Sequence, residues 1–406
     1  MAKWLEKTLG EVTAFIAKGI PPKYTEEENE NTIRVLNQKC NRNFEISYNE
    51  SRIHDCEKKK VPVDKMLRAG DVLINSTGTG TAGRVAQMVE VPVPTTIDGH
   101  MILIRPSEEL DPIYYGYAVK SFQSQIEGLA EGSTGQTEIN RRRLQDEVII
   151  RYPNDKLVQK NIGSFLANID EKIKTNKAIN KNLLQQAIAL YEHLLQEAEW
   201  PTTTILDVAK KVAMGPFGSN IKVSTFVPEG VPIISGNHLR GYFLEEPVFN
   251  YITEEHAERL KNSIVFPHDL IFTHAGNIGQ VAMIPDECKY ERYVLSQRQF
   301  YLRCDETKVV PEFLLLFFHS ASGQHELLSY ANQTGVPSIA QPASNLKKIP
   351  FKCPPMQEQL KWQEQVHPLL SRYLNNRLEN ERLSSLRDTL LPKLMSGELD
   401  VSNVEI

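Results

Sequence analysis

The sequence lacks the features that define several large classes of protein. Its five cysteines are scattered and never form a Cys-x-x-Cys pair, which argues against a disulfide framework or a zinc site and for a reducing cytoplasm. No apolar run approaches the roughly 20 residues needed to cross a bilayer, and residues 1–6 do not resemble a signal peptide. Since 406 residues suffice for two domains, we expect a cytoplasmic two-domain protein without a metal or a membrane segment.

Positive charge is not in excess either. The 46 Lys and Arg residues are outnumbered by 51 Asp and Glu, so the formal net charge is −5. Such a chain has no global attraction to nucleic acid, and any DNA binding must come from local basic patches.

Catalytic signatures are also missing. The chain has no Gly-x-Gly-x-x-Gly after a predicted strand, no Gly-x-x-x-x-Gly-Lys-Ser/Thr phosphate loop, no His-Glu-x-x-His and no Gly-x-Ser-x-Gly. The glycine-rich run 78–83 predicts a hairpin turn, because residues 85–89 have the pattern of another strand. We therefore expect this chain to catalyse no reaction by itself.

What the sequence does contain is an internal repeat. Residues 70–75 (Gly-Asp-Val-Leu-Ile-Asn) are echoed by residues 268–273 (His-Asp-Leu-Ile-Phe-Thr), with 198 residues between Asp71 and Asp269. Each run is followed by a glycine-bearing turn, a Val-Ala pair and, later, a proline that begins a helical stretch. The common order of these features predicts two copies of one plan.

Each copy divides into two parts by pattern. Residues 1–153 and 200–353 consist of short apolar runs separated by Gly, Pro, Asn and Asp, which predicts strands, turns and few helices. Residues 154–199 and 354–406 are nearly free of Gly and Pro over long stretches, which predicts a long helix in each. The fold class expected is α+β, with two similar mixed domains and two long spacer helices related by a pseudo-twofold repeat.

The two helices carry matching heptad patterns, which indicates a coiled coil. The apolar seam predicted for the first helix comprises Ile162, Leu166, Ile169, Ile173, Asn176, Asn180, Leu183, Ala187, Leu190 and Leu194. The seam of the second helix comprises Trp362, Val366, Leu369, Tyr373, Asn376, Asn380, Leu383, Arg387, Leu390 and Leu394.

Asparagines interrupt both seams at the same two places. If the helices are antiparallel, Asn176 lies opposite Asn380 and Asn180 lies opposite Asn376, so that polar layers meet and set the register. The alternative is that these asparagines lie on a solvated stretch where the helices diverge.

Two motifs carry a resemblance to a known family. The chain resembles the specificity (S) subunit of type I DNA restriction–modification systems at two motifs. They are the element Pro-Pro-Met-Gln-Glu-Gln at 354–359 and the ending Leu-Leu-Pro-Lys-Leu-Met-Ser-Gly-Glu-Leu at 390–399. The alternation of globular and helical parts resembles that family over essentially the whole chain. The start of the first helix departs from the pattern, because residues 153–159 lack the doubled proline and the Glu, which would make two partner contacts unequal.

This resemblance implies a function and a set of partners. Residues 1–153 and 200–353 would be two target-recognition domains, each recognising one half of a split sequence in double-stranded DNA. The helices would act as a ruler and dock two methyltransferase subunits, which carry S-adenosylmethionine, while added restriction subunits use ATP and Mg²⁺. This chain would bind none of these cofactors and would be a non-catalytic subunit.

Candidate DNA contacts are polar residues on predicted turns, since Asn and Gln suit adenine and Arg suits guanine. In the first domain they are Ser76, Thr77, Thr79, Arg84, Gln136, Thr137, Asn140 and Arg141. In the second domain they are Phe217, Ser219, Asn237, His238, Arg240, His274, Asn277, Gln297, Arg298, Gln333 and Thr334. The alternatives are a purely structural hairpin at 76–84 and a solvated helix start at the arginine run 141–143.

Docking candidates lie on outward faces and at the ends of the predicted helices. They are Tyr191, His193, Lys393 and Met395. Two rival functions remain open, a two-headed scaffold for protein partners and an enzyme with an unfamiliar site. Salt-dependent binding to duplex DNA would separate the chosen function from the scaffold.

Overall fold

The structure is a computed structural model that describes residues 3–132, 137–332 and 335–399. The chain forms two compact units, one of Met1–Lys177 with Arg377–Ile406 and one of Ala178–Asn376. Each unit contains one globular part together with half of each long helix. The predicted domain limits at 153, 199 and 353 divide the chain differently and stay a prediction.

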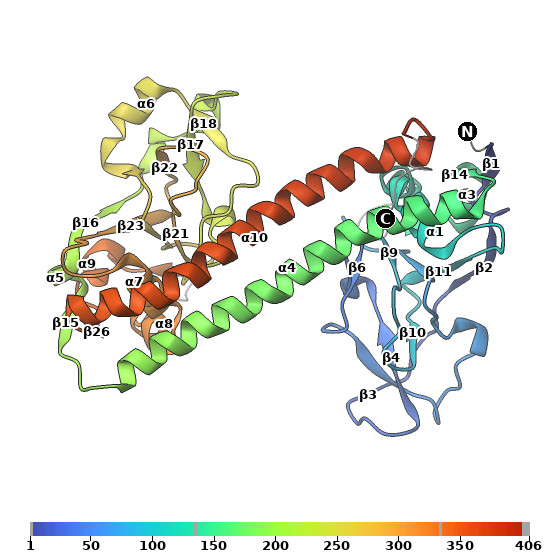
Figure 1. The fold of residues 1–406 in the computed structure, drawn as a ribbon, viewed down its shortest axis with the longest axis horizontal. Helices are drawn as coiled ribbons and strands as arrows, with labels where there is room; N and C mark the ends of the chain where they lie inside the picture. The colour runs from blue at the N-terminus through green and yellow to red at the C-terminus, as the bar shows by residue number, and fades with distance from the viewer. Residues whose placement is uncertain (1–2, 133–136, 333–334, 400–406) are drawn as a thin grey trace. The chain divides into compact units, whose positions relative to one another are not determined.

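The first unit is built around two four-stranded sheets (Figure 1). One sheet has the strand order β2-β11-β8-β9 and the other β10-β4-β7-β3. The globular elements in chain order are β1 (Trp4–Thr8), β2 (Thr13–Lys18), β3 (Tyr24–Thr25), β4 (Thr32–Leu36), β5 (Asn41–Arg42), β6 (Glu45–Ile46), β7 (Arg52–Asp55), β8 (Val72–Asn75), β9 (Val85–Gln87), β10 (Thr95–Ile97), β11 (Met101–Pro106), α1 (Pro112–Ser121), α2 (Gln123–Gly128), β12 (Ala130–Glu131), β13 (Glu138–Ile139), α3 (Arg141–Glu147) and β14 (Ile149–Pro153).

The second unit repeats this plan. Its sheets have the orders β16-β23-β20-β21 and β18-β17-β22-β19. The globular elements are β15 (Thr202–Thr204), α5 (Ile205–Val208), β16 (Ala209–Met214), β17 (Val231–Ile234), β18 (Asn250–Ile252), α6 (Glu254–Arg259), β19 (Ile264–Val265), β20 (Leu270–Thr273), β21 (Val281–Met283), β22 (Tyr293–Leu295), β23 (Gln299–Cys304), α7 (Pro311–His319), α8 (Ala321–Leu328), β24 (Ala331–Asn332), β25 (Ser338–Ile339), α9 (Pro342–Leu346) and β26 (Pro350–Lys352).

The repeated sequence motif forms the same structure in both units. Strands β8 and β20 are completely buried, and each begins after an aspartate that pairs with an arginine of the neighbouring strand. Asp71 accepts from Arg105 at 2.7 Å, and Asp269 accepts from Arg303 at 2.6 Å. Such pairs satisfy a buried carboxylate that would otherwise be costly to desolvate. The predicted hairpin is confirmed, because β8 pairs antiparallel with β9.

Two uninterrupted helices of 41 residues, α4 (Lys156–Gln196) and α10 (Met356–Ser396), run through both units (Figure 1). A buried glutamine near the start of each fastens the helix to its own globular part. Gln159 accepts from the backbone N–H of Asp111 at 2.7 Å and donates to Pro153 O at 2.8 Å. Gln359 accepts from the N–H of Val310 at 3.0 Å and donates to Pro354 O at 2.8 Å. The first helix therefore keeps this anchor although it lacks the doubled proline.

The helices pair in opposite directions within each unit. In the first unit, Asn176 Nδ2 donates to Asn380 Oδ1 at 3.0 Å. In the second, Asn376 Nδ2 donates to Asn180 Oδ1 at 2.8 Å. These are the pairs expected of antiparallel helices, and three of the four amides are buried, which contradicts the solvated alternative for them. That the pairs set the register stays a prediction.

Two expectations about outward helix faces are wrong. Tyr191 is buried, with its ring 5.0 Å from that of Phe313 and 6.4 Å from that of Trp362. Met395 is buried in the core of the first unit. Both side chains meet globular parts that lie far from them in sequence, so the heptad frame alone did not reveal their burial. No helix in the described ranges combines the length and apolarity needed to span a bilayer.

Candidate nucleic-acid interface

Three segments of the first unit meet at the end of strand β8. The backbone N–H of Ser76 donates to His100 O at 2.8 Å, and the N–H of Ile139 donates to Ser76 O at 2.8 Å. Thr77 and Glu138 form an antiparallel bridge. The turn 76–84, the turn before β11 and the segment leading into α3 thus form one surface, which joins two sets of residues that the sequence suggested separately.

A glycine secures the far side of this turn. Gly83 has φ of 87°, and a Cβ atom added there would lie 2.6 Å from Glu127 Cα. Only glycine tolerates both the left-handed conformation and this approach. The turn is therefore held against α2, and its polar residues keep a defined position.

The predicted contacts of the first unit differ in exposure. Thr79, Asn140 and Arg141 are exposed, while Thr77, Arg84 and Thr137 are partly buried. The prediction that Ser76 contacts DNA is wrong, because its side chain is completely buried and cannot reach a base. Gln136 lies outside the described residues.

Asn140 has a structural role as well as an exposed position. Its side chain caps α3 by accepting from the N–H groups of Arg142 at 3.0 Å and Arg143 at 3.3 Å. Arg143 pairs with Glu131 at 2.5 Å and with Glu147 at 2.6 Å, and Arg142 lies 3.6 Å from Asp146. Arg142 and Arg143 therefore fit the alternative given for the arginine run, a solvated helix start.

Arg141 differs from the other two arginines of the run 141–143, because its guanidinium forms no ion pair with a described residue. It has no ion-pair partner within the described ranges, and its charge acts together with burial to lower the pKa of Lys18. An unpaired guanidinium next to a polar turn is suited to a phosphate or a base edge.

The second unit brings the corresponding segments together with the same backbone bonds. The N–H of His274 donates to Arg298 O at 2.9 Å, and the N–H of Ile339 donates to His274 O at 2.8 Å. His274 Nε2 lies 3.1 Å from Gln297 O, and the Gln297 amide donates to Gly218 O. The loop at 217–220 therefore joins this surface.

Most candidates of this unit are exposed. They are Phe217, Asn237, Arg240, Asn277, Gln297 and Arg298, with His274 partly buried. Neither Arg240 nor Arg298 has an ion-pair partner in the described part of the chain. Gln333 and Thr334 lie outside the described residues, as does the side chain of Ser219.

The prediction that His238 contacts DNA is also wrong. It is buried, its Nδ1 accepts from the N–H of Ser235 at 2.9 Å, and its Nε2 lies 3.0 Å from Val248 O. Both ring nitrogens are engaged, so this side chain supports the turn at 235–239 and has no free group for a base.

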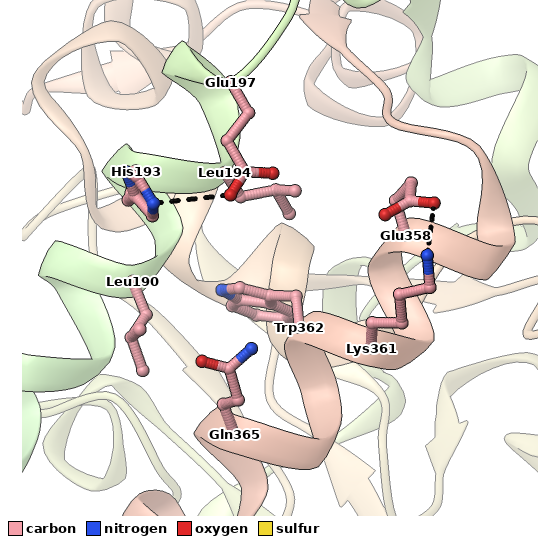
Figure 2. A pocket seen from close by; sticks show the side chains of 8 residues that line it. All are labelled: Leu190, His193, Leu194, Glu197, Glu358, Lys361, Trp362 and Gln365. Carbon is pink, nitrogen blue, oxygen red and sulfur yellow. Dashed lines mark hydrogen bonds and ion pairs between the residues drawn. The ribbon is translucent and has the colours of Figure 1, made fainter.

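A small pocket of about 140 Å³ lies where the end of α4 meets the start of α10 in the second unit (Figure 2). Its charges are paired with one another, His193 with Glu197 at 3.3 Å and Lys361 with Glu358 at 2.8 Å. The indole Nε1 of Trp362 is buried here and has no hydrogen-bond partner among the residues that the structure describes. Of the docking candidates, His193 and Lys393 are exposed.

The described residues also include no group of three or more His, Cys, Asp or Glu side chains that could hold a metal ion. One exposed residue was missed by the sequence analysis. His100 corresponds to Arg298 at the repeat offset of 198, the same offset that relates Asp71 to Asp269, so the repeat could have identified it.

Comparisons with known proteins agree with this architecture. A curated relative is the specificity subunit of the type I restriction enzyme MjaIX of Methanocaldococcus jannaschii, 22% identical over 393 residues that cover 89% of this chain and 83% of the relative. The crystal structure of a type I restriction–modification S subunit from M. genitalium has the same fold, with a TM-score of 0.59, 16% identity and coverage of 97% of this chain and 96% of that one. The sequence matches the type I restriction modification DNA specificity domain twice, over residues 1–185 and 197–387. The chain therefore belongs to the family of type I restriction–modification specificity subunits.

Proposed function

We propose that this chain is the sequence-specific DNA-recognition subunit of a type I restriction–modification complex, and that each globular part recognises one half of a bipartite target. The observation that carries the proposal is the repeated surface. In both units, one set of backbone bonds gathers exposed amide and guanidinium groups on adjoining turns, and the exposed hydroxyl of Thr79 adds to them in the first unit. Such groups supply both kinds of DNA contact, to phosphates and to base edges.

The free arginines explain how a protein of net charge −5 binds DNA. Arg141 belongs to the surface of the first unit and Arg298 to that of the second, whereas neighbouring Arg142 and Arg143 are paired with carboxylates. Local positive charge therefore remains where the polar turns lie. This distribution favours DNA over the rival function as a scaffold for protein partners.

The chain itself performs no catalysis in this proposal. Two methyltransferase subunits would bring S-adenosylmethionine, and restriction subunits, where present, would bring ATP and Mg²⁺, so that the complex acts on DNA in the cytoplasm. The methyltransferases would dock on the long helices, with exposed His193 and Lys393 near the contacts. Because the side chains at the two helix ends differ, the two contacts would be unequal.

A genome-wide methylation map tests the proposal. Cells that express this chain with its methyltransferase should show methyl-adenine at one split motif, and cells that lack only this chain should not. An exchange of residues 200–353 with those of a related chain should change one half of the motif. An unchanged map after deletion would contradict the proposal and favour the scaffold, whose binding would not show the salt dependence of phosphate contacts.

A further inference from the structure

His100 occupies the place in the first unit that Arg298 occupies in the second. The carbonyl of each residue accepts a hydrogen bond from the first residue of the glycine-bearing turn, Ser76 at 2.8 Å and His274 at 2.9 Å. Each residue lies just before an inner strand of its four-stranded sheet, β11 or β23, and both side chains are exposed. The two side chains are therefore equivalent positions on the two proposed recognition surfaces.

The backbone of His100 is held by a buried carboxyl group. Asp98 Oδ1 accepts from the N–H of His100 at 2.9 Å, and burial raises the pKa of Asp98. The carbonyl of Asp98 also accepts from the N–H of Met101 at 3.2 Å, and this bond joins the turn to β11. The imidazole thus projects from a fixed turn.

The imidazole ring is oriented by one hydroxyl group. Thr77 Oγ1 lies 2.9 Å from His100 Nδ1 and 3.4 Å from Gln38 Oε1. In the tautomer in which Thr77 Oγ1 donates across the shorter contact, Nδ1 accepts and the ring proton is on Nε2. Nε2 has no partner among the described residues, which leaves an oriented donor facing solvent.

We propose that His100 is a specificity-determining residue that donates its Nε2–H to N7 of a purine in one half of the target. This inference rests on the proposed function. N7 is the acceptor that both purines present in the major groove. Arg298, whose guanidinium suits the N7 and O6 acceptors of guanine, would make the corresponding contact in the other half.

The decisive measurement removes the acceptor from the DNA and leaves the protein intact. The complex of the full chain with its methyltransferase subunits is titrated against duplexes that carry the methylated motif, with one purine at a time replaced by its 7-deaza analogue. Loss of one hydrogen bond should weaken wild-type binding about 3- to 10-fold at one position. The His100→Ala and His100→Phe complexes should show no loss at that position.

Two controls separate the possible failures. Arg298→Ala should abolish sensitivity to 7-deazapurine in the other half of the motif only. If the wild-type complex has no split motif, the proposed function itself fails. If the motif exists but no 7-deaza substitution distinguishes wild type from His100→Phe, the role of His100 is overturned. His100→Phe is included because it keeps a ring of similar size. If neither variant folds, the wild-type complex alone tests the role. Wild-type binding that is insensitive to 7-deaza substitution at every purine of one half then overturns it.

Discussion

Ser76 and Ser263 are buried serines that differ in the partner of the hydroxyl group. Ser263 Oγ donates to Met214 O at 3.0 Å, whereas Ser76 Oγ has no partner within the described ranges. A buried hydroxyl without a partner costs stability, and a paired one contributes about 1 kcal/mol. Ser76→Ala should therefore raise the free energy of unfolding by about 1 kcal/mol, and Ser263→Ala should lower it by a similar amount.

Urea unfolding of the two variants, with hydrogen exchange followed in β8 and β16, measures these changes unit by unit. Ser76→Ala should also leave the methylation motif unchanged, because the side chain is buried. Destabilisation by Ser76→Ala would contradict a buried hydroxyl without a partner, and an altered methylation motif would contradict a side chain that cannot reach the DNA.

At the scale of elements, Gln159 and Gln359 make corresponding contacts at the starts of α4 and α10. Both are fully buried, and alanine at either position leaves a backbone N–H, of Asp111 or Val310, without its acceptor. Each substitution should cost about 2–3 kcal/mol. Gln159→Ala should speed hydrogen exchange in residues 157–162 alone, and Gln359→Ala in residues 357–362 alone. Faster exchange at both helix starts in one variant would contradict separate anchors.

For the whole molecule, Arg298 and Arg141 test whether the two surfaces act independently. Arg298→Ala should cost about 1–3 kcal/mol at one base pair in one half of the target and leave the other half unchanged. Arg141→Ala should keep the motif and reduce the dependence of log K on log salt by about 1, as expected for one lost phosphate contact. Equal loss of specificity in both halves after Arg298→Ala would contradict independent recognition.

The sequence by itself determined the elements and their repetition. The repeated runs at 70–75 and 268–273 contain strands β8 and β20, and the proline that follows later in each copy, Pro112 or Pro311, begins helix α1 or α7. The heptad spacing located α4 and α10, and the two asparagine layers indicated antiparallel pairing. These features were predictable because turn residues, helix starts and hydrophobic periodicity act over a few residues.

Only the tertiary structure decided which candidate side chains face solvent. Ser76, Tyr191 and Met395 looked available in sequence but are buried by segments distant along the chain, and His238 is buried with both ring nitrogens bonded within residues 235–248. No sequence motif marked His100, yet Ser76 and Thr77 bond to it and hold it on the first surface. The physical reason is that exposure and hydrogen-bond partners depend on packing between remote segments, which no local pattern specifies.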